Sequence, residues 1–468
     1  MLLQRGIVSD NDEYLFPVDE EFTREDLRSF INYHRTNYEE QYKDKLREYK
    51  GQTKAFDDEI AQNMQDHNHL IVNFPKNLVD TLNGYFIGIP PTIKVDDQDK
   101  DKVLQAWIRN NSFVDKLAEV SKQSSIYGKA FMLAYNNENS ELKTAVLSPD
   151  QSFMIYDDTI NKKPIAFVTY GKNAKNEITG TAYYSNRADS FTYIDDIRIT
   201  DSKLLVFKGK VPAVEFFDNE ERMGVFDPVI TLIHAYDKAF SAKLDDIDYF
   251  AHAYLFLKNF DLTEEEQLNI KQNRLIVTKN ASGEYDVDAK FLEKPDADGN
   301  QENILNRLTT MIYQISMIAN ISDDVFGSST SGTALAYKMQ SMSNLAVNKE
   351  RKFTQNLRAM FDVIGVQVPY GEPMDIAFRF TRNIPNNVAE EAETAKNLIG
   401  ITSLETALST LSVVSDPKAE ITRIQDEQNE ATKNAVNNNP ATDYGFVSST
   451  EEKNDTEKAD TPSNKQGA

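Results

Sequence analysis

The chain has 468 residues, 40% of them hydrophobic, so it is long enough to form two or more packed regions. Its 74 acidic residues against 51 basic ones give a formal net charge of -23, which argues against a protein that binds nucleic acid tightly by neutralising many phosphates. That charge does not exclude a protein past which DNA must slide. The absence of cysteine excludes disulfides and thiolate metal sites, and it is compatible with a reducing compartment.

Neither end of the chain nor its middle shows a membrane or export signal. The N-terminus lacks a sustained apolar stretch, and no uninterrupted apolar run approaches the roughly 20 residues of a membrane span. We therefore expect a soluble, non-secreted protein with no membrane partner.

The first half of the chain combines helical and strand patterns. Apolar residues at helical spacing predict an amphipathic helix that ends at Gly51, a short helix after Asn73 and a third helix from Lys102 to about Lys122. From Ile126 to about Phe217, short aromatic or β-branched runs alternate with turn residues, which predicts an antiparallel β meander. With the helical second half, the pattern indicates an α+β fold that is mostly helical.

A helix, an insert and a second helix follow the meander. From Asp227, apolar residues recur every three or four positions and predict a helical rod of about 30 residues, roughly 45 Å long. Short strands and turns come next, and then a second apolar stripe that can pack against the first rod. That stripe consists of Ile304, Leu308, Met311 or Ile312, Ile315 and Ile318. The three parts predict an out-and-back arm.

Acidic residues decorate the first rod. They are Asp237, Asp245, Asp246 and Asp248. A solvated helix face is the simplest explanation for them, and lining an aqueous passage is the alternative if the protein forms a ring.

The stretch "DDVFGSSTSGT" carries Gly327 and Gly332 at the spacing of a phosphate-binding P-loop. A nucleotide site needs Lys and a hydroxyl directly after the second glycine, whereas Thr333 and Ala334 stand here. We therefore interpret the stretch as a small, polar connector that caps a long helix from Thr333 to Ile364.

Other candidate sites are also incomplete. His67 and His69 stand two apart beside Asp66, but no further ligands at metal-binding spacing accompany them. The turn around Asp296 lacks the closing Glu of a calcium loop. Since no catalytic constellation is present, we expect a protein that is not an enzyme and needs no cofactor or metal. The alternatives left open are a nuclease or NTPase centred on the histidines or the Gly327 loop, and an acidic scaffold without a channel.

Segments spread over most of the chain carry a resemblance to a known family. They are Asn73 to Ile93, Ser124 to Tyr135, Leu147 to Thr159, Asn219 to Ile247, Ile321 to Met339, and Ser403 to Gln428. In this order they resemble the portal proteins of tailed bacteriophages, of the long-tailed siphovirus type.

The resemblance implies a homo-oligomeric ring, a dodecamer, at one capsid vertex. Double-stranded DNA would be packaged and ejected through the ring, which would nucleate head assembly and dock terminase and then the head-tail adaptor. Further partners would be the major capsid and scaffolding proteins. The protein would be part of the virion, assembled in the host cytoplasm.

The resemblance also implies the portal parts: wing, two-helix stem, clip and helical crown. Mapped onto this chain they are 1–226 wing, 227–258 stem helix 1, 259–301 clip, 302–320 stem helix 2, 321–332 tunnel loop, 333–402 long helix and return to the wing, 403–430 crown, and 431–468 a disordered tail. The tunnel loop would narrow the channel around DNA through Asp323, Asp324, Phe326, Gly327, Ser328, Ser329, Thr330, Ser331 and Gly332.

Overall fold

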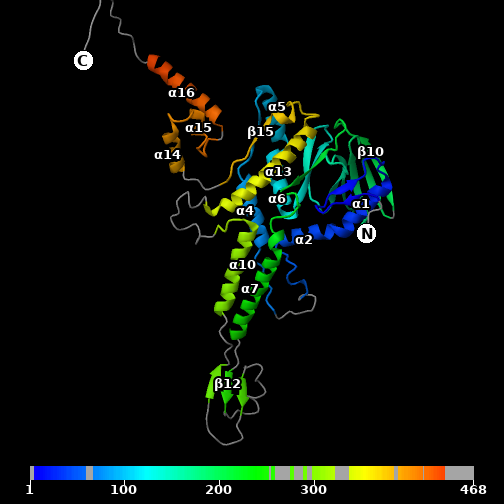
Figure 1. Cartoon of the computed structure of the whole chain (residues 1–468), viewed down its shortest axis with the longest axis vertical. Helices are drawn as coiled ribbons and strands as arrows, with labels where there is room; N and C mark the ends of the chain where they lie inside the picture. Colours follow the sequence, from blue (N-terminus) through cyan, green and yellow to red (C-terminus); the bar gives the residue numbers. More distant parts are fainter. Residues whose placement is uncertain are drawn as a thin grey trace, which may run out of the picture. The chain divides into compact units, whose positions relative to one another are not determined.

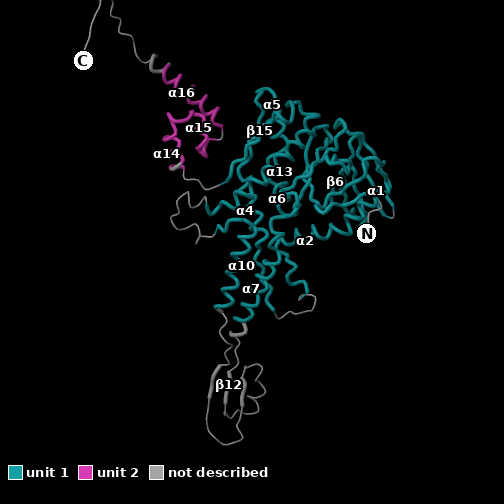
Figure 2. The backbone as a smooth tube through the Cα atoms, viewed as in Figure 1, with its two compact units in different colours: residues 1–383 teal, residues 384–468 magenta. Residues whose placement is uncertain are grey.

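The computed structural model describes residues 5–58, 67–194, 196–251, 255–258, 275–278, 288–291, 298–321, 337–383, 388–414 and 416–437. The chain divides into two compact units, Met1–Asn383 and Ile384–Ala468 (Figure 2). Helices and sheets both contribute, which confirms the predicted α+β class. Among the described residues, no helix combines the length and apolarity needed to cross a membrane.

A seven-stranded sheet with helices beside it forms much of the first unit (Figure 1). Its strand order is β1, β2, β6, β7, β8, β9, β10, and all neighbours are antiparallel except β2 and β6. The strands are β1 Ile7–Val8, β2 Tyr14–Phe16, β6 Ser152–Asp157, β7 Pro164–Lys172, β8 Ile178–Tyr184, β9 Arg187–Tyr193 and β10 Ile197–Leu204. Helix α1 (Arg24–Asn37) buries Leu27, Phe30 and Ile31 in the core formed with this sheet, and α2 (Glu39–Tyr49) continues from it.

The predicted meander is antiparallel, as expected, but it is divided between two sheets. β4 (Lys129–Asn136) pairs with β5 (Leu142–Leu147) on one side and with β11 (Ala213–Phe217) on the other. This second sheet has the order β11, β4, β5. Expecting one continuous meander was wrong, because the pairing of β11 with β4 joins segments far apart in the sequence.

Several helices pack around the second sheet. They are α4 (Phe74–Ile87), α5 (Gln98–Asn110), α6 (Phe113–Tyr127) and α13 (Gln340–Ile364), and α13 lies against β11. The single helix predicted from Lys102 to Lys122 is two helices, because Ser112 adopts the left-handed backbone conformation (φ 48°) between them. β3 (Thr92–Val95) and β15 (Ile376–Arg379) form a two-stranded antiparallel sheet in the same unit, and the 3-10 helix η2 (Pro373–Asp375) precedes β15.

The predicted helix, insert and helix are present. After the short 3-10 helix η1 (Asp227–Val229), α7 (Ile230–Ala251) packs side by side with α10 (Asp298–Ser316), as Figure 1 shows. α7 is shorter than predicted, since β12 (Leu255–Lys258) lies within the range expected to be helical. β12 pairs in parallel with β13 (Leu275–Thr278) and antiparallel with β14 (Asp288–Phe291).

The second unit is helical over its described residues. It contains α14 (Val388–Leu398), α15 (Leu404–Leu408) and α16 (Pro417–Asn437). Ser403 caps α15, with its hydroxyl accepting a hydrogen bond from the Thr406 amide. The prediction of a disordered tail over 431–468 was wrong for residues 431–437, which belong to α16, and the rest of the predicted tail lies outside the described residues.

Candidate functional site

We call the helix pair α7 and α10 the stem, after the part it was predicted to form, and α7 carries the aspartates predicted to line a channel. One face of α7 binds the strap, which we define as residues 67–72. The Val72 amide donates to Asp237 Oδ1 at 2.9 Å, the Leu70 amide to Ser241 Oγ at 2.8 Å, and the Asn68 amide to Asp245 Oδ1 at 2.8 Å.

The repeat distance along the helix matches the repeat distance along the strap, which explains this ladder of three hydrogen bonds. Positions 237, 241 and 245 lie on one helix face and are separated by about 6 Å along the axis. Every second residue of an extended chain repeats after roughly 6.6 Å and points its amide to the same side. Three side chains of α7 therefore satisfy alternate backbone amides of the strap, as a neighbouring strand would.

Asp245 anchors one end of the strap as a carboxylate. Burial alone would raise its pKa, but hydrogen bonds from the Asn68 amide, the Asn68 side chain and His67 lower the pKa below its usual value. Asn68 Nδ2 lies 2.7 Å from Oδ1, and His67 Nδ1 lies 3.2 Å from Oδ2. His67 is thus part of the strap anchor.

Asp237 at the other end is fully buried within its own chain. Burial raises its pKa to about 6, against smaller opposing effects of the Val72 amide and His234. Its Oδ2 has no hydrogen-bond partner among the described residues. This burial removes Asp237 from the channel-lining candidates, since the strap and not solvent covers it.

The other predicted residues occupy different positions. Asp246 Oδ2 accepts a hydrogen bond of 2.7 Å from Gln301 Nε2 and so ties α7 to α10. Asp248 lies on α7, near the end of the helix. The predicted tunnel-loop residues, Asp323, Asp324, Phe326, Gly327, Ser328, Ser329, Thr330, Ser331 and Gly332, lie outside the described residues.

The metal hypothesis for the histidines gains no support. His67 binds Asp245, whereas the His69 ring packs on Phe56 with 4.7 Å between centroids. Over the part of the chain that the structure describes, no three His, Asp or Glu side chains are placed to hold a metal ion.

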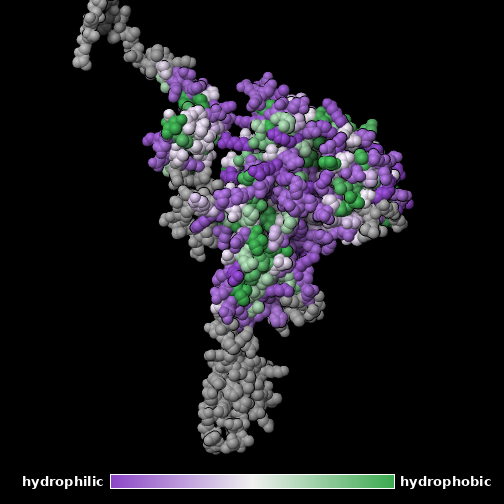
Figure 3. Space-filling view, in the orientation of Figure 1, coloured by the Kyte–Doolittle hydropathy of each residue, from purple (hydrophilic) through white to green (hydrophobic). Residues whose placement is uncertain are grey.

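α10 carries two apolar stripes rather than one. Leu305 and Ile312 are buried, at 5% and 0% exposure, whereas Ile304 and Ile315 are 53% and 45% exposed. The prediction that Ile304 and Ile315 face α7 was wrong, because the 3.6-residue period fits two adjacent faces of this helix equally well. A hydrophobic band runs along the stem in Figure 3. The stem therefore presents an uncovered apolar face.

A buried ion pair fixes α13 to α6 and to the turn after β11, and it was not predicted from the sequence. Lys349 Nζ lies 2.8 Å from Asp218 Oδ2, 2.7 Å from Ser125 Oγ and 2.9 Å from the Ser121 carbonyl oxygen. Burial lowers the pKa of Lys349, and Asp218 opposes that shift. A sequence signal was available, since Lys349 falls on the apolar seam between Ala346 and Phe353.

A second buried cluster stabilises the turn that leads into the stem. Arg222, with a left-handed backbone (φ 55°), donates to Glu215 at 2.7 Å and to Glu13 at 3.3 Å. Burial would raise the pKa of Glu215, but Arg222 and Lys129 hold it below its usual value. The two clusters hold the segment between β11 and the stem against the sheets and α13 through buried ionic contacts.

Comparison with known proteins agrees with this architecture. The family model described as "Phage portal protein, SPP1 Gp6-like" matches residues 28–434. The chain belongs to this family. It is 23% identical to the portal protein of Bacillus phage SPP1 over 405 residues, which are 80% of this chain and 78% of that protein.

Two solved structures are also similar to this chain. They are the neck of an empty gene transfer agent (GTA) particle and the virion of a native GTA particle. Each has a TM-score of 0.41 and 10% identity over 70% of this chain, covering 86% and 84% of those chains respectively. The family assignment confirms the resemblance found in the sequence. It also confirms that the chain is not an enzyme, since portal proteins are structural connectors.

Proposed function

We propose that this chain forms the portal ring of a tailed phage, through which double-stranded DNA is packaged and ejected. The family match over residues 28–434 carries the proposal. The similarity to the SPP1 portal protein and the uncovered apolar face of the stem support it.

The second stripe of α10 is the proposed contact between neighbouring copies. Fully burying an isoleucine side chain contributes about 1.5–3 kcal/mol, so exposed Ile304 and Ile315 supply a driving force for association. Ile247 of α7, at 54% exposure, adds to the same apolar character of the stem. In a ring the stripe would contact a different face of the neighbouring copy, because head-to-tail contacts close a ring whereas a stripe paired with itself closes a dimer.

The channel would be a passive conduit. A net charge of -23 keeps the affinity for DNA low, because few phosphates can be neutralised. Ser328 to Ser331 would offer neutral hydrogen bonds to the passing backbone. Asp246 and Asp248 remain candidates for the channel wall. Asp245 would contribute to that wall only through the part of its side chain that the strap leaves exposed.

The remaining partners follow from the proposed role. Terminase would supply the ATP hydrolysis, and the capsid, scaffolding and head-tail adaptor proteins would bind the outside of a dodecameric ring. The ring would be assembled in the host cytoplasm and remain at the neck of the virion.

Negative-stain imaging of the purified protein tests the ring. The full chain should form rings with a central hole, whereas the double variant Ile304→Asp, Ile315→Asp should give folded subunits that do not assemble. Asn306→Asp, at an exposed polar position of the same helix, is the matched control and should form rings. Only monomers or particles without a hole, under several salt conditions, would count against the proposal. Metal-dependent DNA cleavage or ATP hydrolysis would favour the enzyme alternative.

The tunnel loop has its own test. Replacing Ser328 to Ser331 with bulky residues should spare ring assembly but impair DNA packaging. Unchanged packaging in a phage with that loop would remove it from the mechanism without affecting the ring.

A further inference from the structure

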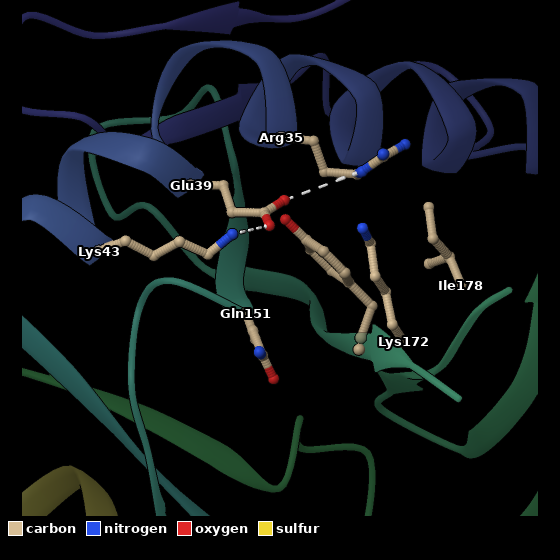
Figure 4. A pocket seen from close by; sticks show the side chains of 8 residues that line it. Arg35, Glu39, Lys43, Gln151, Lys172 and Ile178 are labelled. Carbon is tan, nitrogen blue, oxygen red and sulfur yellow. Dashed lines mark hydrogen bonds and ion pairs between the residues drawn. The ribbon is translucent and has the colours of Figure 1, made fainter. Parts of the chain in front are cut away.

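A pocket of about 220 Å³ lies on the first unit, where α1 meets α2 beside the end of β7 (Figure 4). Three cationic side chains line it: Arg35 from α1, Lys43 from α2 and Lys172 from β7. Glu39 is the one carboxylate in the lining. The lining therefore carries a formal charge of +2, three cations minus one anion, on a chain whose net charge is -23.

Glu39 cannot neutralise the three cations at once. Lys43 binds its Oε1, and Arg35 Nε lies 3.8 Å from its Oε2. Lys172 forms no ion pair within the described part of the chain. In Figure 4 the Lys172 ammonium and the Arg35 guanidinium extend into the same space from opposite walls. Glu40 and Asp150 also raise the pKa of Lys43, but neither lines the pocket, so Glu39 is the one carboxylate of the lining beside Arg35 and Lys172.

Part of the lining is buried and uncharged. Tyr170 is 5% exposed, and its hydroxyl lies 2.7 Å from His34 Nδ1. Burial lowers the pKa of His34 to about 3, so the imidazole is neutral at physiological pH. The hydrogen bond fixes the Tyr170 side chain without adding charge, and the second uncharged lining side chain, Ile178, is 9% exposed.

We propose that this pocket binds a single carboxylate side chain from an acidic segment of a partner protein, between Arg35 and Lys172. The volume of the pocket is sufficient for one side chain that ends in an anionic group. Guanidinium and ammonium groups pair well with carboxylates. Duplex DNA fits less well, because its dense row of phosphates requires an open basic surface, whereas exposed Glu40 acts on Lys43 from outside the lining.

Glu39 competes with the bound carboxylate for the cations of the pocket. Replacing Glu39 and replacing a cation should therefore change the binding affinity in opposite directions. Binding of fluorescently labelled octaglutamate to the full-length protein is measured by anisotropy at low ionic strength. Lys172→Gln and Arg35→Gln should each weaken binding about three- to fivefold, the range of half-exposed ion pairs. Glu39→Gln should strengthen binding by a similar factor. Lys203→Gln, which removes a surface cation far along the sequence from the pocket, is the matched control and should change nothing.

Two outcomes would overturn the proposal. One is an equal loss of binding in Lys172→Gln and Lys203→Gln, which shows non-specific attraction, or a loss in Glu39→Gln, which shows that Glu39 does not compete for the cations. The other comes from competition experiments, in which a short DNA duplex or unlabelled octaglutamate displaces the labelled octaglutamate. If the duplex does so at a lower concentration of phosphate groups than the concentration of carboxylate groups that unlabelled octaglutamate requires, the pocket would be assigned to nucleic acid. Ring formation should be unaffected in all these variants, so failure here is distinguishable from failure of the portal proposal.

Discussion

Asp237→Asn tests whether burial raises the pKa of the Asp237 carboxyl, which holds the Val72 amide at one end of the strap. In the folded chain, burial raises the pKa of Asp237 from 3.8 to about 6. Between these two values the folded chain holds a proton that the unfolded chain has released. The stability contributed by Asp237 therefore falls as pH rises from about 4 to about 6.

The size of the effect follows from the same values. At pH 5 the raised pKa stabilises the folded chain by about 1.4 kcal/mol, and at pH 7.5 by almost nothing. Asparagine keeps one oxygen for the Val72 amide but has no carboxyl proton. The free energy of unfolding of the natural chain, minus that of Asp237→Asn, should therefore be about 1.4 kcal/mol larger at pH 5 than at pH 7.5.

Urea denaturation at both pH values measures this difference, with mass photometry confirming the same assembly state throughout. Asp99→Asn, at a side chain that is 92% exposed, is the control and should give equal differences at the two pH values. Equal differences for Asp237→Asn, or a larger one at pH 7.5, would refute the role of burial at this position.

Three further changes test the packing around the stem. Ser241→Ala removes the acceptor of the middle strap amide, so hydrogen exchange in the strap should accelerate about fivefold, equivalent to ~1 kcal/mol, while Ala242→Ser on the exposed side leaves it unchanged. Lys349→Met leaves Asp218 buried without its partner and should cost about 3–5 kcal/mol of unfolding free energy in urea; a cost below 1 kcal/mol would contradict the buried pair. Met317 has a left-handed backbone (φ 60°), which glycine adopts without strain. Met317→Gly should therefore relieve roughly 1 kcal/mol of backbone strain and raise the melting temperature, and a lower melting temperature would contradict strain at this position.

The local periodicities of the sequence predict most of the elements but not how they pair. The alternation between Ile126 and Phe217 indicates strands correctly, because side chains on the two faces of a strand meet different surroundings. It cannot show that β11 leaves the meander to pair with β4, since that choice depends on contacts between distant segments. Likewise, the left-handed Ser112 that separates α5 from α6 interrupts an apolar pattern that continues through it.

The candidate site was harder to predict, because the same residue pattern serves several environments. Asp237, Ser241 and Asp245 at four-residue spacing are typical of a solvated helix face, yet they hold the strap. Nothing in the helix itself identifies its partner. Lys349 could have been recognised, since a lysine on an apolar seam needs a buried partner.

The contacts of α7 also limit what the stem can present to a channel. The strap occupies the face with Asp237, Ser241 and Asp245, and α10 contacts Asp246 through Gln301. An aspartate whose oxygens already accept hydrogen bonds from its own chain loses little free energy when it leaves water. The donors that surround its carboxylate also weaken its electrostatic effect on the channel. A channel wall formed by this helix would therefore be less acidic than its sequence suggests. Low affinity for DNA would then depend on the scarcity of cations along the wall rather than on a ring of free carboxylates.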